Sequence, residues 1–181
     1  MLDDLRWNYY LVEPYDYLRT PAAVHRHRAV AAMKAGDVAE AEREIDRVLN
    51  AAPADTQVAE ELVPLLERAG RRAQAEALFT RVHRVYQQGL LEYPQSGLLH
   101  NNLAWVSARC HRRLDDALKH AQQANELAPD NAAYVDTLAE AYFQLGDREQ
   151  AIRWSRRALQ LQPGDETLQK QLARFEHDPL P

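Results

Sequence analysis

The sequence predicts an all-α chain built from repeated pairs of antiparallel helices. The chain has 181 residues with only 6 glycines, and it is rich in Ala and Leu but poor in Val and Ile, which favours helix over strand. Apolar residues recur at spacings of three and four, as on one face of a helix. Gly36 and Gly70 lie 34 residues apart in two consecutive segments of similar pattern. This spacing gives the length of one helical hairpin.

The clearest hairpin covers residues 130–163. Its first helix is expected to start at an N-cap within Asp130-Asn131 and to end at Gly146, which adopts a left-handed C-cap at no steric cost. Asp147 is expected to cap the second helix, which stops before Pro163. The buried stripe of the first helix follows the i, i+3, i+4, i+7 spacing and consists of Val135, Leu138, Ala139 and Tyr142. We further expect Ala139 to cross Ala151 of the second helix closely.

Three earlier hairpins are predicted over residues 20–53, 54–94 and 95–129, so that the repeats together fill residues 20–163. The first starts with Thr20 as N-cap and Pro21 at the first helical position. The second contains Pro64, for which a kink is expected, and its last helix continues to Pro94, about two turns longer than the others. The third carries one extra residue in its turn.

The two ends are expected to cover the array. Residues 1–19 are aromatic-rich and predict an N-terminal capping or linking helix, with a docking surface for a neighbouring domain as the alternative. Residues 164–181 predict a C-terminal capping helix and tail, with a polar side exposed to water.

The order of residues in the 130–163 hairpin resembles the tetratricopeptide repeat (TPR) family. The matching residues are Leu138, Ala139, Tyr142, Gly146, Ala151, Ala158 and Pro163. The resemblance implies an all-α, right-handed α-α superhelix, a TPR solenoid, whose first helices line a concave groove. It also implies a non-catalytic module for protein–protein interaction. The alternatives are an accessory or regulatory segment of a larger enzyme and a scaffold that assembles with itself.

Positions on the first helices predict where a partner would bind. One row across the repeats reads Val30, Pro64, Trp105 and Glu140, and the next reads Lys34, Arg68, Arg109 and Gln144. The predicted groove residues are Lys34, Arg68, Asn101, Asn102, Trp105, Arg109 and Glu140. They suit a peptide or protein partner with an apolar anchor and with acidic groups or a free carboxylate. In this prediction the two asparagines bond the partner's main chain.

A purely structural interpretation of these residues stays open. Lys34, Arg68 and Arg109 all fall in the last turn of their helices, where a cation is favoured by the helix dipole without any ligand. Trp105 could equally belong to the core. The family's cluster of basic and Asn residues that clamps a C-terminal carboxylate is not reproduced, because Val30 stands where a second Asn is needed.

The sequence predicts no catalytic site, no metal site and no cofactor. Ser107, His111 and Asp115 are spaced four apart, but the helix is expected to end between them, so they do not form a triad. His25 and His27 point to opposite sides of a helix and cannot share a metal. The carboxylates of Asp136 and Glu140 share a helix face and are interpreted as solvated groove charge.

Charge and hydropathy limit the partners. The net charge is −5 and no basic block occurs, which argues against nucleic acid. No apolar run reaches membrane-spanning length, so no membrane partner is expected. A cytoplasmic location is the default, and the chain could be a fragment of a larger protein. The sequence leaves the oligomeric state and the identity of the partner open.

Overall fold

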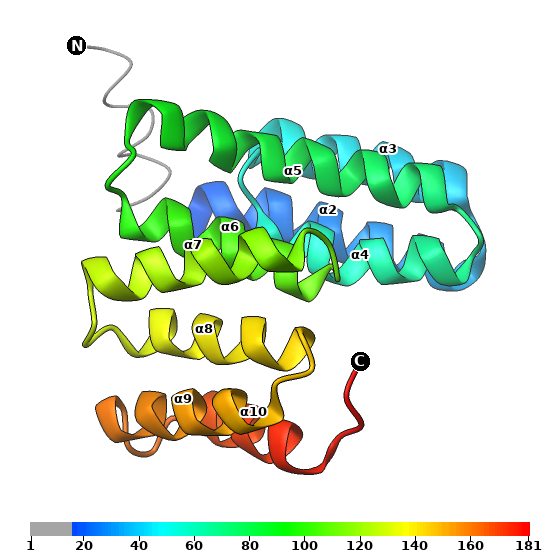
Figure 1. Cartoon of the computed structure of the whole chain (residues 1–181). Coiled ribbons are helices and arrows are strands. Elements are labelled where there is room, and N and C mark those ends of the chain that lie inside the picture. The colour runs from blue at the N-terminus through cyan, green and yellow to red at the C-terminus, as the bar shows by residue number, and fades with distance from the viewer. Residues whose placement is uncertain (1–15) are drawn as a thin grey trace. The chain divides into compact units, whose positions relative to one another are not determined.

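The computed structural model describes residues 16–181, and over this range the chain forms nine helices and no strand (Figure 1). The all-α helical-repeat fold expected from the sequence is confirmed. The helices are α2 (Asp16–Ala35), α3 (Val38–Ala51), α4 (Thr56–Arg68), α5 (Arg72–Glu92), α6 (Gly97–Arg109), α7 (Leu114–Leu127), α8 (Ala132–Gln144), α9 (Arg148–Leu161) and α10 (Glu166–His177). The predicted N-terminal helix over 1–19 lies almost entirely outside the described residues.

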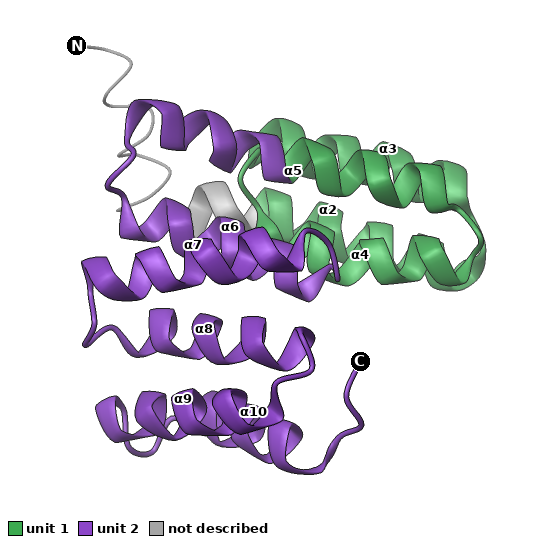
Figure 2. Cartoon of the chain, viewed as in Figure 1, with its two compact units in different colours: residues 1–82 green, residues 83–181 purple. Residues whose placement is uncertain are grey.

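The chain divides into two compact units, residues 1–82 and residues 83–181, and helix α5 runs across the boundary (Figure 2). In unit 1, α2 packs against α3 and α4. In unit 2, each helix from α6 to α10 packs against the next, and α6 also contacts α8. The first helices of two successive hairpins, α6 and α8, are therefore neighbours within unit 2.

Caps and turns follow the predicted chemistry. Asp37 and Asp147 accept hydrogen bonds from the backbone N–H groups three residues on, Glu40 and Gln150, each at 3.0 Å. Such caps satisfy N–H groups that a helix start leaves without a partner. The turn glycine Gly146 has a φ of +86°, a conformation that residues with a side chain rarely adopt. The predicted helix limits in the 130–163 hairpin are thereby confirmed.

The predicted start of the first hairpin is wrong. Helix α2 is already helical at Asp16, so Pro21 lies inside it and Thr20 is not its N-cap. A proline blocks the backbone hydrogen bond of its own turn but does not forbid helix on its N-terminal side. Pro64 is likewise contained within α4, which continues to Arg68.

The structure contains the expected long helix and the expected unusual turn in the middle hairpins, while the kink at Pro64 stays a prediction. Helix α5 extends to Glu92, just before Pro94. In the turn between α6 and α7, His111 and Arg113 have φ angles of +53° and +51°. Two non-glycine residues in the left-handed region accommodate the extra residue of this turn, at a cost in backbone strain.

The core of the last hairpin is formed by small residues at the helix crossing and large ones around it. Ala139 and Ala151 are both fully buried and share a cluster with Phe143 and Phe175, the latter from α10. Leu138 is 2 % exposed and packs in a neighbouring cluster. The close Ala139–Ala151 packing brings α8 and α9 together, and α10 closes the end of the hairpin.

Candidate functional site

The predicted groove residues of unit 2 lie on helices α6 and α8, where they meet residues of α10. Asn101, Trp105 and Arg109 are spaced four apart on α6, and so are three residues of α8. Side chains at this spacing lie along one line of a helix. We call this surface the polar face of unit 2, defined by Asn101, Asn102, Trp105, Arg109, Asp136, Glu140, Gln144, Gln171 and Arg174.

Glu140 is the centre of the polar face. Its side chain is 0 % exposed, and its carboxylate accepts hydrogen bonds from donors on three helices. Arg109 of α6 donates to Oε1 at 3.3 Å, and Gln144 of α8 donates to the same atom at 2.7 Å. From α10, Gln171 donates to Oε2 at 2.9 Å, and Arg174 also donates to Oε2. A buried carboxylate is tolerated only when its oxygens are satisfied in this way.

This burial corrects the sequence-based interpretation of the two acids on α8. Asp136 is 8 % exposed and Glu140 is fully buried, so neither is solvated groove charge. Arg109, which was predicted to offer its charge to a partner, forms an ion pair with Glu140. The donors from α10 decide this outcome, because they cover the carboxylates that α6 and α8 alone would leave open.

Asp136 lies one turn before Glu140, and its carboxylate oxygens are only partly hydrogen-bonded. Its Oδ2 accepts a long hydrogen bond of 3.4 Å from Gln171, and its Oδ1 has no hydrogen-bond partner within the described part of the chain. Burial, followed by the nearby negative charge of Glu140, raises the pKa of Asp136 to about 7. The positive charges of Arg174 and Arg109 oppose this pKa shift, while Asp165 adds to it.

The α6 side of the polar face carries the predicted asparagines and the tryptophan. The Asn101 side-chain amide donates to Oδ1 of Asn102 at 3.2 Å, and Asn101 is 9 % exposed. Trp105 is half-buried, and the Arg109 guanidinium lies 5.6 Å from the centroid of its ring. This is a cation–π distance. The indole is therefore partly covered by a side chain of its own helix.

The acceptor oxygens Asn101 Oδ1 and Gln144 Oε1 have no hydrogen-bond partner among the described residues. Buried acceptors of this kind are uncommon, because each costs free energy when it is left without a donor. Like Asp136 Oδ1, both oxygens are buried, so the accessible amide on the α6 side is that of the half-buried Asn102.

Two of the predicted groove residues belong to unit 1. Lys34 and Arg68 are exposed in the last turns of α2 and α4, as the sequence suggested. The predicted rows that join these cations to Trp105 and Arg109 span both units and remain predictions.

Sequence reasoning missed Gln171 and Arg174, which it placed only in a solubilising end helix. Adding the repeat length to Glu140 once more, 140 + 34, gives position 174. Treating the C-terminal helix as the first helix of another hairpin would therefore have found Arg174.

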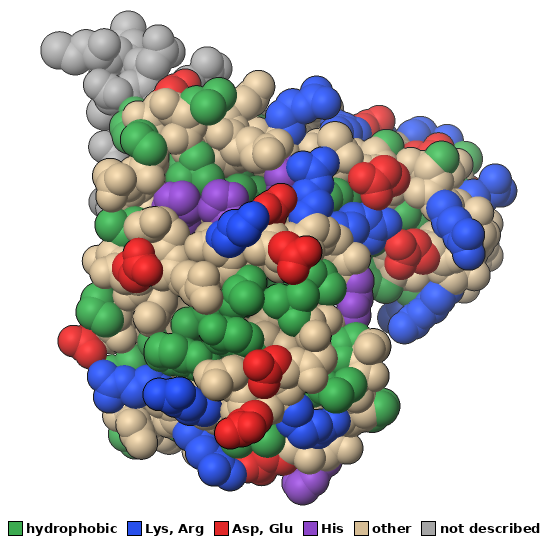
Figure 3. All heavy atoms as spheres, in the orientation of Figure 1, with side chains coloured by type: hydrophobic (Ala, Val, Ile, Leu, Met, Phe, Trp, Pro, Cys, Tyr) green, Lys and Arg blue, Asp and Glu red, His purple; other side chains and the backbone are tan. Residues whose placement is uncertain are grey.

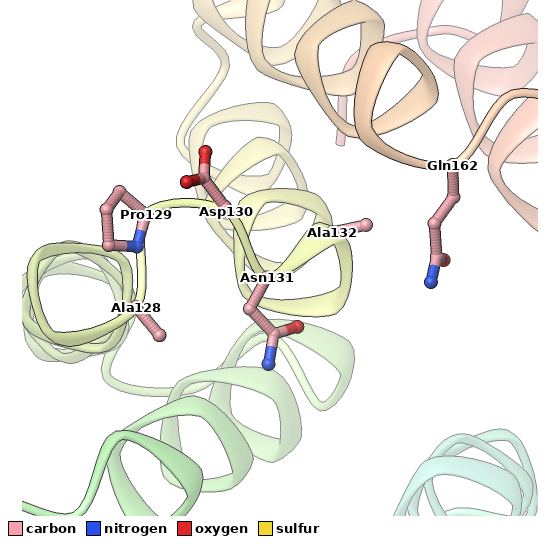
Figure 4. Close-up of a pocket in the computed structure, with 6 residues that line it drawn as sticks. All are labelled: Ala128, Pro129, Asp130, Asn131, Ala132 and Gln162. Carbon is pink, nitrogen blue, oxygen red and sulfur yellow. The ribbon is translucent and has the colours of Figure 1, made fainter.

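A depression lies where the turn between α7 and α8 approaches the end of α9 (Figure 4). Two of its polar side chains, those of Asn131 and Asp130, already serve the local structure. Asn131 accepts hydrogen bonds from the backbone N–H groups of Ala133 and Tyr134, and Asp130 pairs with Arg157 at 3.0 Å. The lining residues hold no combination of nucleophile and base.

The residues spaced like a catalytic triad lie on α6, in the turn after it and at the start of α7. Helix α6 ends at Arg109, Ser107 is buried, and His111 is exposed in the following turn. Over residues 16–181, no group of three or more His, Cys, Asp or Glu side chains could hold a metal ion. Within the same range, no helix is long and apolar enough to cross a membrane.

Positively and negatively charged side chains lie next to one another on the surface. On the face shown in Figure 3, Lys and Arg side chains (blue) lie beside Asp and Glu side chains (red) over α9 and α10. Histidine side chains (purple) gather next to α7.

Comparison with known proteins agrees with this architecture. Residues 132–175 match the family model of the tetratricopeptide repeat. No curated protein matches the sequence at a significant level.

Two solved structures have a similar fold. A thermophilic TPR protein of Thermus thermophilus, TTC0263, is 18 % identical, with a TM-score of 0.52 over 86 % of this chain and 98 % of the other. The second TPR domain of human RPAP3, solved in complex with an HSP70 peptide, is 19 % identical, with a TM-score of 0.50 over 69 % of this chain and 98 % of that domain. The chain thus contains a tetratricopeptide repeat at residues 132–175 and has the helical-hairpin fold of TPR proteins.

Proposed function

We propose that this chain is a non-catalytic protein-interaction module that binds a peptide or an extended segment of a partner protein. The observation that carries the proposal is the half-buried Trp105 near Asn102 on α6, a first helix that lies beside the next first helix, α8, in a TPR-type fold. An aromatic anchor beside groups that bond a main chain suits an extended peptide. The solved RPAP3 domain, which is similar in fold, holds an HSP70 peptide.

The proposed contacts differ between the two units. In unit 2, Trp105 receives an apolar side chain, while the half-buried amide of Asn102 bonds the peptide main chain. In unit 1, the exposed cations Lys34 and Arg68 meet acidic groups or a free carboxylate of the partner. Arg109 contributes less charge than the sequence suggested, because Glu140 neutralises it.

Rigid helices lower the entropic cost of this mode of binding. Stacked hairpins hold their side chains in place before the partner arrives, so the peptide alone bears most of the ordering entropy. The donors to Glu140 from three helices fix the polar face in the same way. We propose no reaction for this surface.

A peptide-display selection on the full chain, followed by affinity measurement of the selected peptides, tests the proposal. We expect Trp105→Ala to weaken binding at least about tenfold, as for an aromatic hot spot. We expect a Lys34→Gln, Arg68→Gln double variant to weaken binding in a salt-dependent manner.

A matched control replaces Lys119 and Arg153 by Gln, since these exposed cations lie on the second helices α7 and α9. Binding should be unchanged in this variant. Equal affinity of the wild type, the Trp105 variant and the unit 1 double variant would remove the proposed site.

A further inference from the structure

The hairpin of α6 and α7 places two imidazole rings in direct contact. Nδ1 of His100 in α6 lies 2.8 Å from Nδ1 of His120 in α7. The ring centroids are 5.0 Å apart and the ring planes are tilted by 33°. Both side chains are half-buried, so they remain accessible to small solutes. The pair takes no part in the polar face and lies within unit 2.

A contact with the backbone of Pro94 fixes the tautomer of His100. Its Nε2 lies 3.0 Å from the carbonyl oxygen of Pro94. A carbonyl oxygen can only accept, so Nε2 carries the proton and Nδ1 of neutral His100 has a lone pair. His120 then donates its own Nδ1–H to this lone pair. The lone pair of His100 is therefore directed at the second imidazole.

This arrangement matches the way proteins prepare histidine as a metal ligand. A ligating histidine commonly donates its other ring N–H to a backbone carbonyl or a carboxylate, which orients the ring and fixes the tautomer. The Pro94 carbonyl plays that part for His100. The second ligand, His120, comes from the other helix of the same hairpin, whose two helices pack against each other.

We propose that Nδ1 of His100 and Nδ1 of His120 bind a divalent transition-metal ion such as Zn²⁺, with solvent in the remaining positions. Imidazole nitrogen is a preferred ligand of this class of ion. Two Zn–N bonds of about 2.0–2.1 Å at a tetrahedral angle place the nitrogens about 3.3 Å apart, so the rings need to separate by about 0.5 Å and to turn until both lone pairs point at the ion. The His120 proton moves to Nε2 through solvent, which frees Nδ1 without changing the charge of the ring.

The surrounding charges are compatible with a bound cation near neutral pH. Burial lowers the pKa of His83 in α5 to about 4, so this nearby ring carries no charge at pH 7. The carboxylate of Asp116 in α7 favours a cation at His120, whereas Lys119 opposes it. Lys119 is partly neutralised by Asp116 at 3.1 Å.

A zinc titration of the full chain with ¹⁵N-labelled histidine rings, followed by NMR at pH 7.5, tests the proposal. We expect the Nδ1 resonances of His100 and His120 to shift together, while the other five histidines stay in place. Mg²⁺, which prefers oxygen ligands, should leave all rings unchanged. This measurement on the wild type does not depend on a variant that folds.

Calorimetric titration of variants with ZnCl₂ gives a second readout. Loss of an outer-shell partner alone weakens a metal site about 10–100-fold, so His120→Gln should weaken Zn²⁺ binding at least about tenfold. The control His177→Gln changes an exposed histidine near the end of α10 and should bind like the wild type. Unchanged His100 and His120 resonances at millimolar Zn²⁺, or equal affinity of His120→Gln and the wild type, would overturn the proposal and show that the pair only stabilises the hairpin.

Discussion

Arg174 in α10 donates a hydrogen bond to the carboxylate of Glu140 in α8, whose side chain has no exposed surface. The contact ties the C-terminal helix to the first helix of the preceding hairpin. Charge-assisted hydrogen bonds of this type are stronger than neutral ones. The C-terminal helix therefore contributes to the polar face as well as covering the end of the fold.

Replacing Arg174 by Gln should lower the free energy of unfolding by about 1–3 kcal/mol, because a buried carboxylate loses a charged donor. Urea unfolding followed by circular dichroism measures this change. The control Arg156→Gln breaks an ion pair with Glu176 that is largely exposed on the Arg side, and it should cost less than about 1 kcal/mol. In a double-mutant cycle, Glu140→Gln and Arg174→Gln should be clearly non-additive. Additive effects on the free energy of unfolding would show that the contact between Arg174 and Glu140 contributes nothing to stability.

Asp136→Asn should stabilise the protein at pH 8 but not at pH 4. The pKa of Asp136 is about 7 in the folded chain against an ordinary value of 3.8, so the folded state binds more protons between these values. The contribution of Asp136 to the stability of the folded state is therefore lost as the pH rises from about 4 to about 7. Asn removes the charge and can still accept from Gln171. A variant that is destabilised equally at pH 4 and pH 8 would contradict this account.

His83 should make the stability of the protein depend on pH in the opposite direction to Asp136. Burial, followed by the charge of Arg113, lowers its pKa from 6.5 to about 4. The unfolded state then binds more protons, so stability is lost as the pH falls from 6.5 towards 4, by at most about 3 kcal/mol. In His83→Leu this loss should disappear, while the exposed control His27→Gln should keep the wild-type profile. An unchanged acid profile in His83→Leu would disprove the assignment.

Glu44 provides a corresponding probe in unit 1. This buried carboxylate accepts from Nδ1 of His25 at 2.5 Å and from Arg47. Burial alone would raise its pKa, but these two contacts lower the pKa below its ordinary value of 4.5. The stability it provides should be present above pH 4.5 and lost on further acidification. Glu44→Gln should be less stable than the wild type at pH 7, with the difference shrinking in acid, as measured by urea unfolding at both pH values.

The hairpins could be predicted from sequence because their signals are local. Asp147 and Gly146 act on the backbone within a few residues, and the stripe containing Leu138 and Ala139 follows the period of one helix. The predicted start of α2 at Pro21 is wrong, because a proline constrains only its own turn and the residue before it and does not have to mark a helix boundary.

The burial of the candidate site could not be predicted in this way. Glu140 is enclosed by donors from α6 and α10, 31 and 34 residues away in the sequence. Its environment therefore depends on how three helices pack, which no single helical pattern encodes. The contact between His100 and His120 has the same origin, since it exists only once α6 lies against α7.

The central claim is that a partner peptide binds on the polar face of unit 2. Backbone NMR of the full chain with and without a peptide from the display selection tests it most directly. We predict shift changes concentrated in α6 and α8, including the side-chain amide of Asn102 and the indole of Trp105. Shift changes confined to the second helices α7 and α9, with α6 and α8 unaffected, would contradict the account.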